Sequence, residues 1–327
     1  MKLTLNVAVV AALVIAPPLA AQTINSQCAH SSGINQDACQ KTVDLFQFMA
    51  PQIATAVAGG NATLGEGNTL GGLGHFTIEA RGNVVSGKAP LFNNATLGTL
   101  GAEQSTFSTT RIALPAALID GGLGLFRGLP AGLTHVFGID LLGSAFYAPN
   151  YTGHGITVRP DRAVELGYGA RVGIVEETRF SPAISATFME RDLPTTTVAG
   201  YDADGDTMRV QNLSVKTSAW RVVVSKNFLV LGLAAGGGQD HDKSSADIAA
   251  QGTLLPGLTY SDNLASPTQS LTRTNYFGDV SLNFPVVKII AEVGGVSQRL
   301  IATYNSFANS HAGDALIYGS FGVRVKI

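Results

Sequence analysis

Hydrophobic and polar side chains alternate with a period of two in many segments of residues 70–327. Between Val164 and Ile174 the even positions are apolar or aromatic, whereas the odd positions carry glycine or a charge, as at Glu165 and Arg171. Residues 320–327 repeat the pattern at the end of the chain. A period of two with one apolar face predicts β-strands that lie between two different environments.

Short and long connections alternate between these segments. Tight turns are expected at 127–132, 176–178, 226–227 and 284–285, and long polar loops at 87–110, 149–159, 191–206, 244–267 and 304–312. The strands are expected at 70–86, 112–126, 132–147, 160–175, 178–190, 206–226, 228–242, 269–284, 286–302 and 313–327. Ten antiparallel strands with short turns at one end and long loops at the other are typical of outer-membrane barrels.

The pattern therefore predicts an all-β chain, an antiparallel transmembrane β-barrel of ten strands preceded by a short N-terminal helical segment. Twelve strands are the alternative if residues 254–260 form a further hairpin. The poor alternation of residues 206–218 predicts a bulge or a projection beyond the bilayer. The stretch 111–125, with its proline and many small residues, is open to a bend or partial helix.

Composition agrees with this class of protein. The chain has 38 glycines and 13% charged residues, and its mean hydropathy is +0.22. After the N-terminus no apolar run is long enough for a membrane-spanning helix, whereas barrel strands need apolar residues only at alternate positions. A soluble β-sandwich, the alternative, is expected to carry more charge on its outer strands. The net charge of −2 excludes a basic nucleic-acid-binding surface.

The first 21 residues have the features of a secretory signal peptide. Lys2 supplies a positive start, Leu3–Ile15 is a short apolar run, and small residues at Ala20 and Ala21 follow Pro17-Pro18. We therefore expect residues 1–21 to be removed on export, residues 22–69 to form a periplasmic or plug-like segment, and residues 70–327 to form the barrel.

The segment of residues 22–69 holds both cysteines and one helical pattern. Cys28 and Cys39 are expected to form a disulfide in an oxidising compartment. Apolar residues at helical spacing predict a helix over Asp37–Ala58, kinked at Pro51 and ended by the glycines that follow. Because ten strands enclose little space, a cap over the inner end of the barrel is favoured over a plug threaded through the lumen.

Charged residues of the second face are expected to point into the lumen. They are Glu79, Arg81, Asp140, Glu165, Arg171, Asp279, Lys288, Glu292 and Arg324. Acids and bases are nearly balanced, so either they pair across strands and brace the wall, or they line a path for small solutes. No strong anion or cation selectivity is indicated.

Other chemistry has little support in the sequence. Asp202, Asp204 and Asp206 offer carboxylates at alternate positions, and a surface calcium site is weighed there against a solvated turn. The spacing departs from an EF-hand loop. No cofactor other than calcium is expected. No nucleophile elbow or protease motif is present, so an enzyme is not expected.

The mature chain resembles bacterial outer-membrane β-barrel proteins with an N-terminal plug-like extension. The resemblance rests on the signal peptide, on residues 70–76 and on the alternating ending of residues 317–327, although the chain ends in Ile327 instead of phenylalanine. A more distant similarity is to fatty-acid-type outer-membrane transporters, which are longer.

The resemblance implies an outer-membrane location, contacts with membrane lipid and lipopolysaccharide, and insertion by the barrel-assembly machinery. With short turns inward, both termini are expected in the periplasm. The expected function is a passive conduit for small or apolar solutes, its inner end occluded by the N-terminal segment. The alternative is a non-conducting structural or adhesive barrel whose loops bind a partner.

Overall fold

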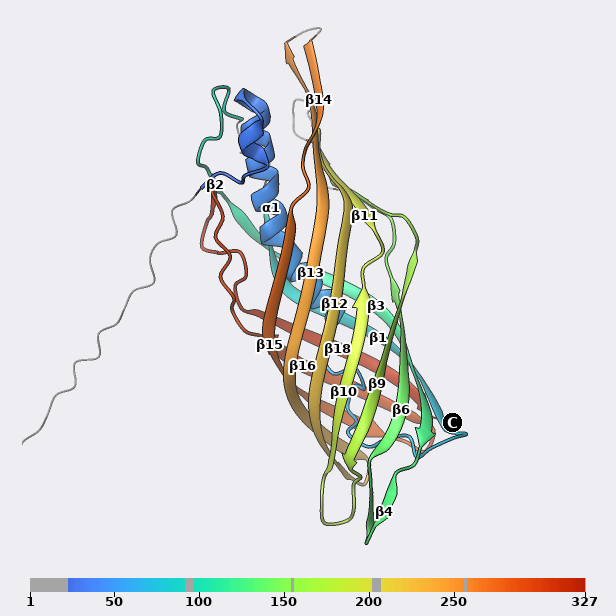
Figure 1. Cartoon of the computed structure of the whole chain (residues 1–327). Coiled ribbons are helices and arrows are strands. Elements are labelled where there is room, and N and C mark those ends of the chain that lie inside the picture. Colours follow the sequence, from blue (N-terminus) through green and yellow to red (C-terminus); the bar gives the residue numbers. More distant parts are fainter. Residues whose placement is uncertain (1–22, 92–96, 154–155, 202–206, 256–257, 327) are drawn as a thin grey trace, which may run out of the picture.

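The computed structural model describes residues 23–91, 97–153, 156–201, 207–255 and 258–326. Ten antiparallel strands form a closed barrel (Figure 1). They are β1 (Phe76–Pro90), β3 (Thr109–Phe126), β6 (Gly138–Tyr147), β9 (Val164–Val175), β10 (Ala183–Asp192), β12 (Thr207–Phe228), β13 (Leu231–Leu255), β15 (Thr268–Asn283), β16 (Val287–Val296) and β18 (Leu316–Lys326). Each pairs with the next, and β18 pairs with β1. The predicted fold class is confirmed.

Short strands extend the barrel beyond its ten-stranded ring. At the end with long loops, β14 (Leu258–Ala265) pairs with β13, and β7 (Tyr151–Gly153), β8 (Ile156–Pro160) and β11 (Thr196–Tyr201) continue the sheet next to β12. At the other end, β4 (Leu129–Ala131) and β5 (Thr134–Val136) form a hairpin. The segment proposed for a twelve-stranded barrel is therefore a projecting hairpin, and the closed ring keeps ten strands.

Several strand boundaries differ from the predictions. Most of the expected loop 244–267 is strand, in β14 and in the continuation of β13 to Leu255, and the expected loops 149–159 and 191–206 contain β7 and β11. Residues 70–75 precede β1 instead of belonging to it, and the expected tight turn at 127–132 is lengthened by the β4–β5 hairpin. The expected irregularity of 206–218 is present as a register shift between Gln211 and Ser214. The stretch 111–125 is continuous strand. We call the two ends of the barrel the short-turn mouth and the long-loop mouth.

Exposed aromatic side chains mark the limits of the lipid-facing band. Phe228 and Phe284 lie at the short-turn mouth, and Trp220 and Tyr276 precede them by eight residues on β12 and β15. Eight residues of a strand tilted by about 40° span about 20 Å, which is close to the apolar band of an outer-membrane barrel. Above this band the outward positions become polar, as at Lys216, so the long strands project beyond it on the long-loop side.

The N-terminal segment contains η1 (Cys28–His30) and α1 (Gly33–Ala58), which lie at the long-loop mouth (Figure 1). The predicted disulfide between Cys28 and Cys39 is present. The helix ends where Gly59 adopts a φ of 61°, a conformation that favours glycine. Among the described residues, no helix is both long and apolar enough to span a membrane.

From Gly59 the chain descends through the barrel to the short-turn mouth, where β1 begins at Phe76. This position differs from the predicted cap over the inner end. The described chain starts at the long-loop mouth, and β18 ends at the short-turn mouth (Figure 1). The alternating pattern predicted which residues point inward, but it held no information about the end from which a preceding segment enters.

Candidate functional site

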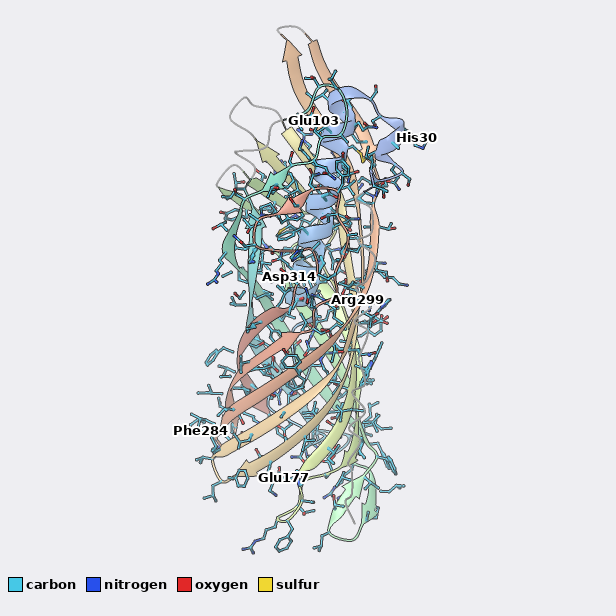
Figure 2. The ribbon with its side chains drawn as sticks, turned by 90° about the vertical axis from the view of Figure 1, so that its left-hand side faces the viewer. His30, Glu103, Glu177, Phe284, Arg299 and Asp314 are labelled. Carbon is cyan, nitrogen blue, oxygen red and sulfur yellow. A yellow bond between two sulfur atoms is a disulfide. The ribbon has the colours of Figure 1, made fainter. Side chains whose placement is uncertain are left out.

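The upper part of α1 is enclosed by two long loops. The Asp37 carboxylate accepts hydrogen bonds from the backbone N–H groups of Gly98, at 2.6 Å, and Glu103, at 2.9 Å. Phe48 stacks on Phe307 with 4.2 Å between ring centroids. Figure 2 shows His30 and Glu103 at this mouth, with Phe284 and Glu177 at the other.

Two segments of these loops also pair with each other. Strands β2 (Thr106–Phe107) and β17 (Ser306–Phe307) form a short parallel pair. Phe107 stacks on Phe307 with 5.6 Å between ring centroids. The helix is therefore the core of a folded structure at the long-loop mouth.

Asp44 connects the helix to the second of these loops. Its carboxylate accepts hydrogen bonds from the Asn305 backbone N–H at 2.8 Å and side-chain Nδ2 at 2.7 Å, and from the Tyr304 N–H at 3.2 Å. Burial raises the pKa of Asp44 above its ordinary value, and the hydrogen bonds from Asn305 only partly oppose this. The contact therefore includes a carboxylate whose charge is not fully compensated.

Pro51 removes one hydrogen bond from the helix, and the barrel wall supplies donors to carbonyl groups near that position. Proline has no N–H for the carbonyl four residues earlier, and Gln269 Nε2 approaches that Gln47 oxygen at 3.5 Å. Arg273 Nη2 donates to the Pro51 carbonyl at 2.6 Å and to Thr55 Oγ1 at 2.7 Å. The lower half of the helix is therefore attached to β15.

Below the helix, Asn61 is the first residue held from several sides of the lumen. Its N–H donates to Glu292 Oε2, its Nδ2 to Asp279 Oδ2, and its carbonyl accepts from Arg81 Nη1, each at 2.9 Å. These partners lie on β16, β15 and β1. One residue of the segment 59–72, which we call the crossing segment, thus joins three strands of the wall.

The rest of the crossing segment is held in the same way by side chains from other strands. The Leu64 carbonyl accepts from Arg324, and N–H groups donate from Gly65 to Asp279, from Gly67 to Ser225, from Thr69 to Glu176 and from Leu70 to Asp140. Backbone groups make these contacts, so they need no particular side chain from the segment.

Glycine lets this backbone pass between bulky wall residues. A Cβ on Gly60 would lie 1.9 Å from Glu292 Oε1, and one on Gly65 would lie 2.8 Å from Ile290 Cγ2. Gly65 also has a φ of +67°, which other residues rarely adopt. These glycines explain how a ten-stranded lumen accommodates the crossing segment, although a cap over the inner end was the favoured expectation.

Ion pairs connect the wall strands around the crossing segment. They are Arg81–Asp120 at 3.0 Å, Arg191–Asp120 at 3.1 Å, Arg171–Asp140 at 2.7 Å, Arg324–Glu79 at 2.6 Å, Lys288–Glu66 at 3.2 Å and Arg221–Asp240. The lumen residues therefore bind one another as well as the crossing segment, and the acids and bases are nearly equal in number.

The structure places eight of the nine expected lumen residues around the crossing segment. Seven are buried and Lys288 is partly buried. Glu165 is separate, because it pairs with Arg162 at 3.0 Å near the long-loop mouth. The candidate calcium ligands Asp202, Asp204 and Asp206 lie outside the described residues. Within the described part of the chain, no group of three or more histidine, cysteine or acidic side chains could hold a metal ion.

Several lumen residues were missed by the sequence argument. Asp120, Arg221 and Asp240 lie at inward positions of strands that were predicted, so strict use of the alternation would have found them. Arg191 was assigned to a loop because the predicted strand ended at residue 190, two residues before the end of β10. Glu66 belongs to the crossing segment, and no periodic signal marks it.

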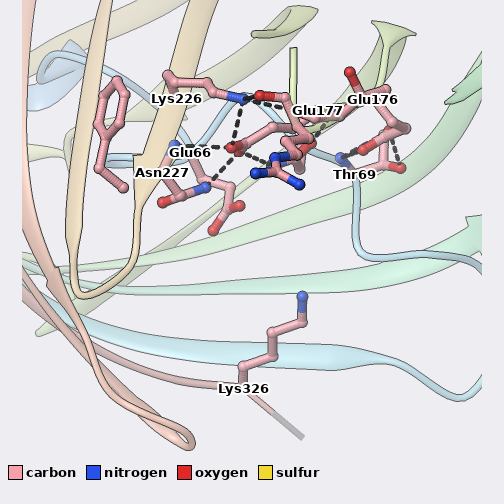
Figure 3. Close-up of a pocket in the computed structure, with 11 residues that line it drawn as sticks. Glu66, Thr69, Glu176, Glu177, Lys226, Asn227 and Lys326 are labelled. Carbon is pink, nitrogen blue, oxygen red and sulfur yellow. Dashed lines mark hydrogen bonds and ion pairs between the residues drawn. The ribbon is translucent and has the colours of Figure 1, made fainter. Parts of the chain in front are cut away.

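A cavity of about 740 Å³ opens at the short-turn mouth (Figure 3). Its acidic side chains Glu176 and Glu177 already have partners. Glu176 accepts from the Thr69 N–H at 3.0 Å, and Glu177 accepts from the Asn227 N–H at 2.9 Å and lies 3.4 Å from Lys226 Nζ. The cavity is the mouth of the lumen, and the crossing segment forms part of its floor.

No family model and no curated protein matches this chain. Solved structures with a similar fold include the attachment invasion locus protein Ail of Yersinia pestis, at 10% identity over 77% of this chain and 99% of that one, with a TM-score of 0.28. The toluene transporter TodX of Pseudomonas putida is 10% identical over 83% and 92%, with a TM-score of 0.28. The transport unit of the autotransporter AIDA-I of Escherichia coli is 7% identical over 90% and 99%, with a TM-score of 0.34.

The structure defines the class of protein on its own terms. A closed ring of ten antiparallel strands, an apolar outer band between two sets of aromatic residues, and a charged interior are the features of a transmembrane outer-membrane β-barrel.

Proposed function

We propose that this protein is a non-conducting outer-membrane barrel that presents a folded, helix-centred surface at its long-loop mouth. The observation that carries the proposal is topological. The helix α1 enters the closed ring from the long-loop mouth, and the carbonyl of its last residue, Ala58, accepts a hydrogen bond from the inward-pointing Arg191, whereas β1 begins at Phe76 at the short-turn mouth. The chain between them therefore has to pass through the lumen.

This path makes a conduit difficult to open. The crossing segment is attached to β1 below and to α1 above, so it can leave the lumen only if the 26-residue helix passes through the barrel. A helix with side chains is about 10 Å wide, and the disulfide holds η1 against its first turns. A movement of that size would also break the contacts of Asp37, Asp44 and Arg273.

The loops at the long-loop mouth are the parts available to a partner outside the cell, since outer-membrane barrels place short turns on the periplasmic side. Burying the helix there orders the loops that contain Glu103 and Phe307. An ordered loop surface loses less conformational entropy on binding than a mobile one. The arrangement suits attachment or surface structure better than passage of a solute.

The test is electrical conductance of the full-length protein in planar bilayers. We expect no stepwise current from folded protein, identified by its heat-dependent mobility on gels. Deletion of residues 23–72 is the matched variant, and any copies that fold should conduct because the charged lumen is then vacant. Stepwise current from the full-length protein would contradict the proposal and favour the conduit.

A further inference from the structure

All four connections at the short-turn mouth carry an exposed apolar side chain at their tips. Leu133 is 87% exposed, Phe180 83%, Leu229 99% and Val286 55%. Turns in water favour glycine, proline, asparagine, aspartate and serine. One exposed leucine is ordinary, whereas an apolar side chain on every turn at one mouth calls for an apolar environment. We name these four residues the turn crown.

Leu229 gives the strongest indication that the turn crown lies in an apolar environment. It has a φ of 55°, a conformation that is uncommon for residues other than glycine and asparagine. Its side chain is almost wholly exposed, and its neighbours Phe228 and Val230 are exposed as well. In water a polar turn residue would suit both the positive φ and the exposure of this position better than leucine does. A leucine is favourable here only if its side chain enters a lipid phase.

The turn crown is continuous with the surface already assigned to lipid. Phe228 and Phe284 end the apolar band, and Leu229 and Val286 follow them within two residues. The apolar surface that ends at Phe228 and Phe284 therefore continues onto the turns. No polar rim separates the band from Leu229, because Val230 follows in the turn and Leu231 begins β13.

Exposed charge at this mouth is mainly positive. Arg127, Arg179 and Lys326 are exposed, and the Arg179 guanidinium lies 6.0 Å from the centre of the Phe180 ring. The nearby acids Glu176 and Glu177 are half-buried and already accept hydrogen bonds from the lumen side. Apolar tips beside exposed cations match the boundary between acyl chains and anionic headgroups.

We propose that the short-turn mouth is a phospholipid-docking surface. The turn crown enters the headgroup–acyl boundary of the leaflet it faces, and Arg127, Arg179 and Lys326 bind lipid phosphates, with a preference for anionic phospholipids. This mouth is therefore seated in the membrane, whereas the opposite end of the barrel projects well beyond it.

The chain offers a direct test because Trp220 is its only tryptophan. In a Trp220→Phe background, Leu229→Trp reports on the turn crown. Leu100→Trp is the matched control, since Leu100 is a 93% exposed leucine at the long-loop mouth. Each full-length protein is reconstituted in phosphatidylcholine–phosphatidylglycerol vesicles, with folding checked by heat-dependent gel mobility.

The expected result is opposite behaviour of the two probes. Lipids brominated near the headgroup should quench Leu229→Trp strongly, and iodide on both sides of the membrane should quench it little. Leu100→Trp should respond to iodide only. Iodide quenching of Leu229→Trp without lipid quenching would overturn the proposal. Protection from both quenchers would also overturn it, because a second protein copy would then cover the crown.

A second variant pair tests the cations. Phe180→Trp is quenched by brominated phosphatidylglycerol or phosphatidylcholine, with and without Arg179→Gln. Removing one cation at a membrane surface should lower the preference for phosphatidylglycerol by about fivefold. Equal preference in both proteins would overturn the headgroup contact of Arg179, while the first probe would still decide insertion of the crown.

Discussion

At the scale of single residues, several charged side chains in the lumen contact both the wall and the crossing segment. Asp140 is fully buried, pairs with Arg171 at 2.7 Å and accepts the Leu70 N–H at 3.1 Å. Arg81 likewise reaches Asp120 and the Asn61 carbonyl. Removing one partner from such a set leaves the others buried without compensation.

The Asp140→Ala variant should therefore lose about 3 kcal/mol of unfolding free energy, because the buried Arg171 charge loses its partner. The measurement is urea unfolding of the protein refolded in lipid vesicles. Asp161→Ala is the control, since Asp161 lies 3.7 Å from Arg162 with both side chains more than half exposed, and its loss should change stability by less than about 1 kcal/mol. Equal effects of the two changes would contradict the assigned role of Asp140.

The Gly60→Ala variant tests how closely the crossing segment fits. The added methyl would meet Glu292 Oε1, so we expect a loss of about 1–3 kcal/mol. Gly143→Ala is the matched control, because nothing lies within 4 Å of a Cβ there. Unfolding midpoints of both proteins give the comparison, and a neutral Gly60→Ala would mean that the segment lies elsewhere in the lumen.

At the scale of elements, α1 is stabilised more by its surroundings than by its own sequence. Asp37, Lys41 and Asp44 are buried in it, and loops that are distant in sequence supply N–H donors to the two aspartates. A helix with buried acids depends on these donors, so it folds together with the loops.

The pH dependence of this contact follows from Asp44, whose pKa is raised in the folded protein. The stabilisation that results from this raised pKa is fully present below the ordinary pKa of 3.8. It is lost as the pH rises through the higher pKa of Asp44 in the folded protein. Relative to Asp44→Asn, the wild-type protein should therefore gain unfolding free energy as pH is lowered from neutral toward 3.8. Denaturant titrations of both proteins across this range provide the measurement. If the wild-type protein instead gained unfolding free energy as the pH was raised, the hydrogen bonds from Asn305 would outweigh burial.

At the scale of the whole molecule, the closed ring fixes the relation between the two ends of the chain. The segment before α1 contacts a long loop, where Gln27 and Ser266 exchange two hydrogen bonds, whereas β18 ends at the short-turn mouth. The N-terminal helix and the C-terminal residues should therefore face opposite sides of the membrane.

An epitope inserted ahead of Thr23 should accordingly be bound by antibody on intact cells. The same epitope between Leu229 and Val230, at the other mouth, should require permeabilised cells. Antibody binding is measured by flow cytometry, with total protein determined in lysates. Binding of both epitopes only after permeabilisation would place the helix on the periplasmic side and contradict the proposed surface function.

The sequence by itself was sufficient to predict the ring. A period of two identified the ten strands, because every residue of a barrel wall faces either lipid or lumen, and short turns differ visibly from long loops. The same alternation placed Asp279 and Arg324 inward, and the two cysteines of the N-terminal segment predicted the disulfide. These features are local or depend on only two environments.

Only the tertiary structure determined where the N-terminal segment lies. The helix was predictable from its spacing, but its place at the long-loop mouth depends on contacts with residues such as Gly98, Gln269 and Asn305, which are distant along the chain. The partners of Asn61 come from three strands that meet only when the ring closes. Alternation specifies the face on which a side chain lies. Which charges meet inside the barrel, and the path the chain takes past them, depend on long-range packing that no local pattern encodes.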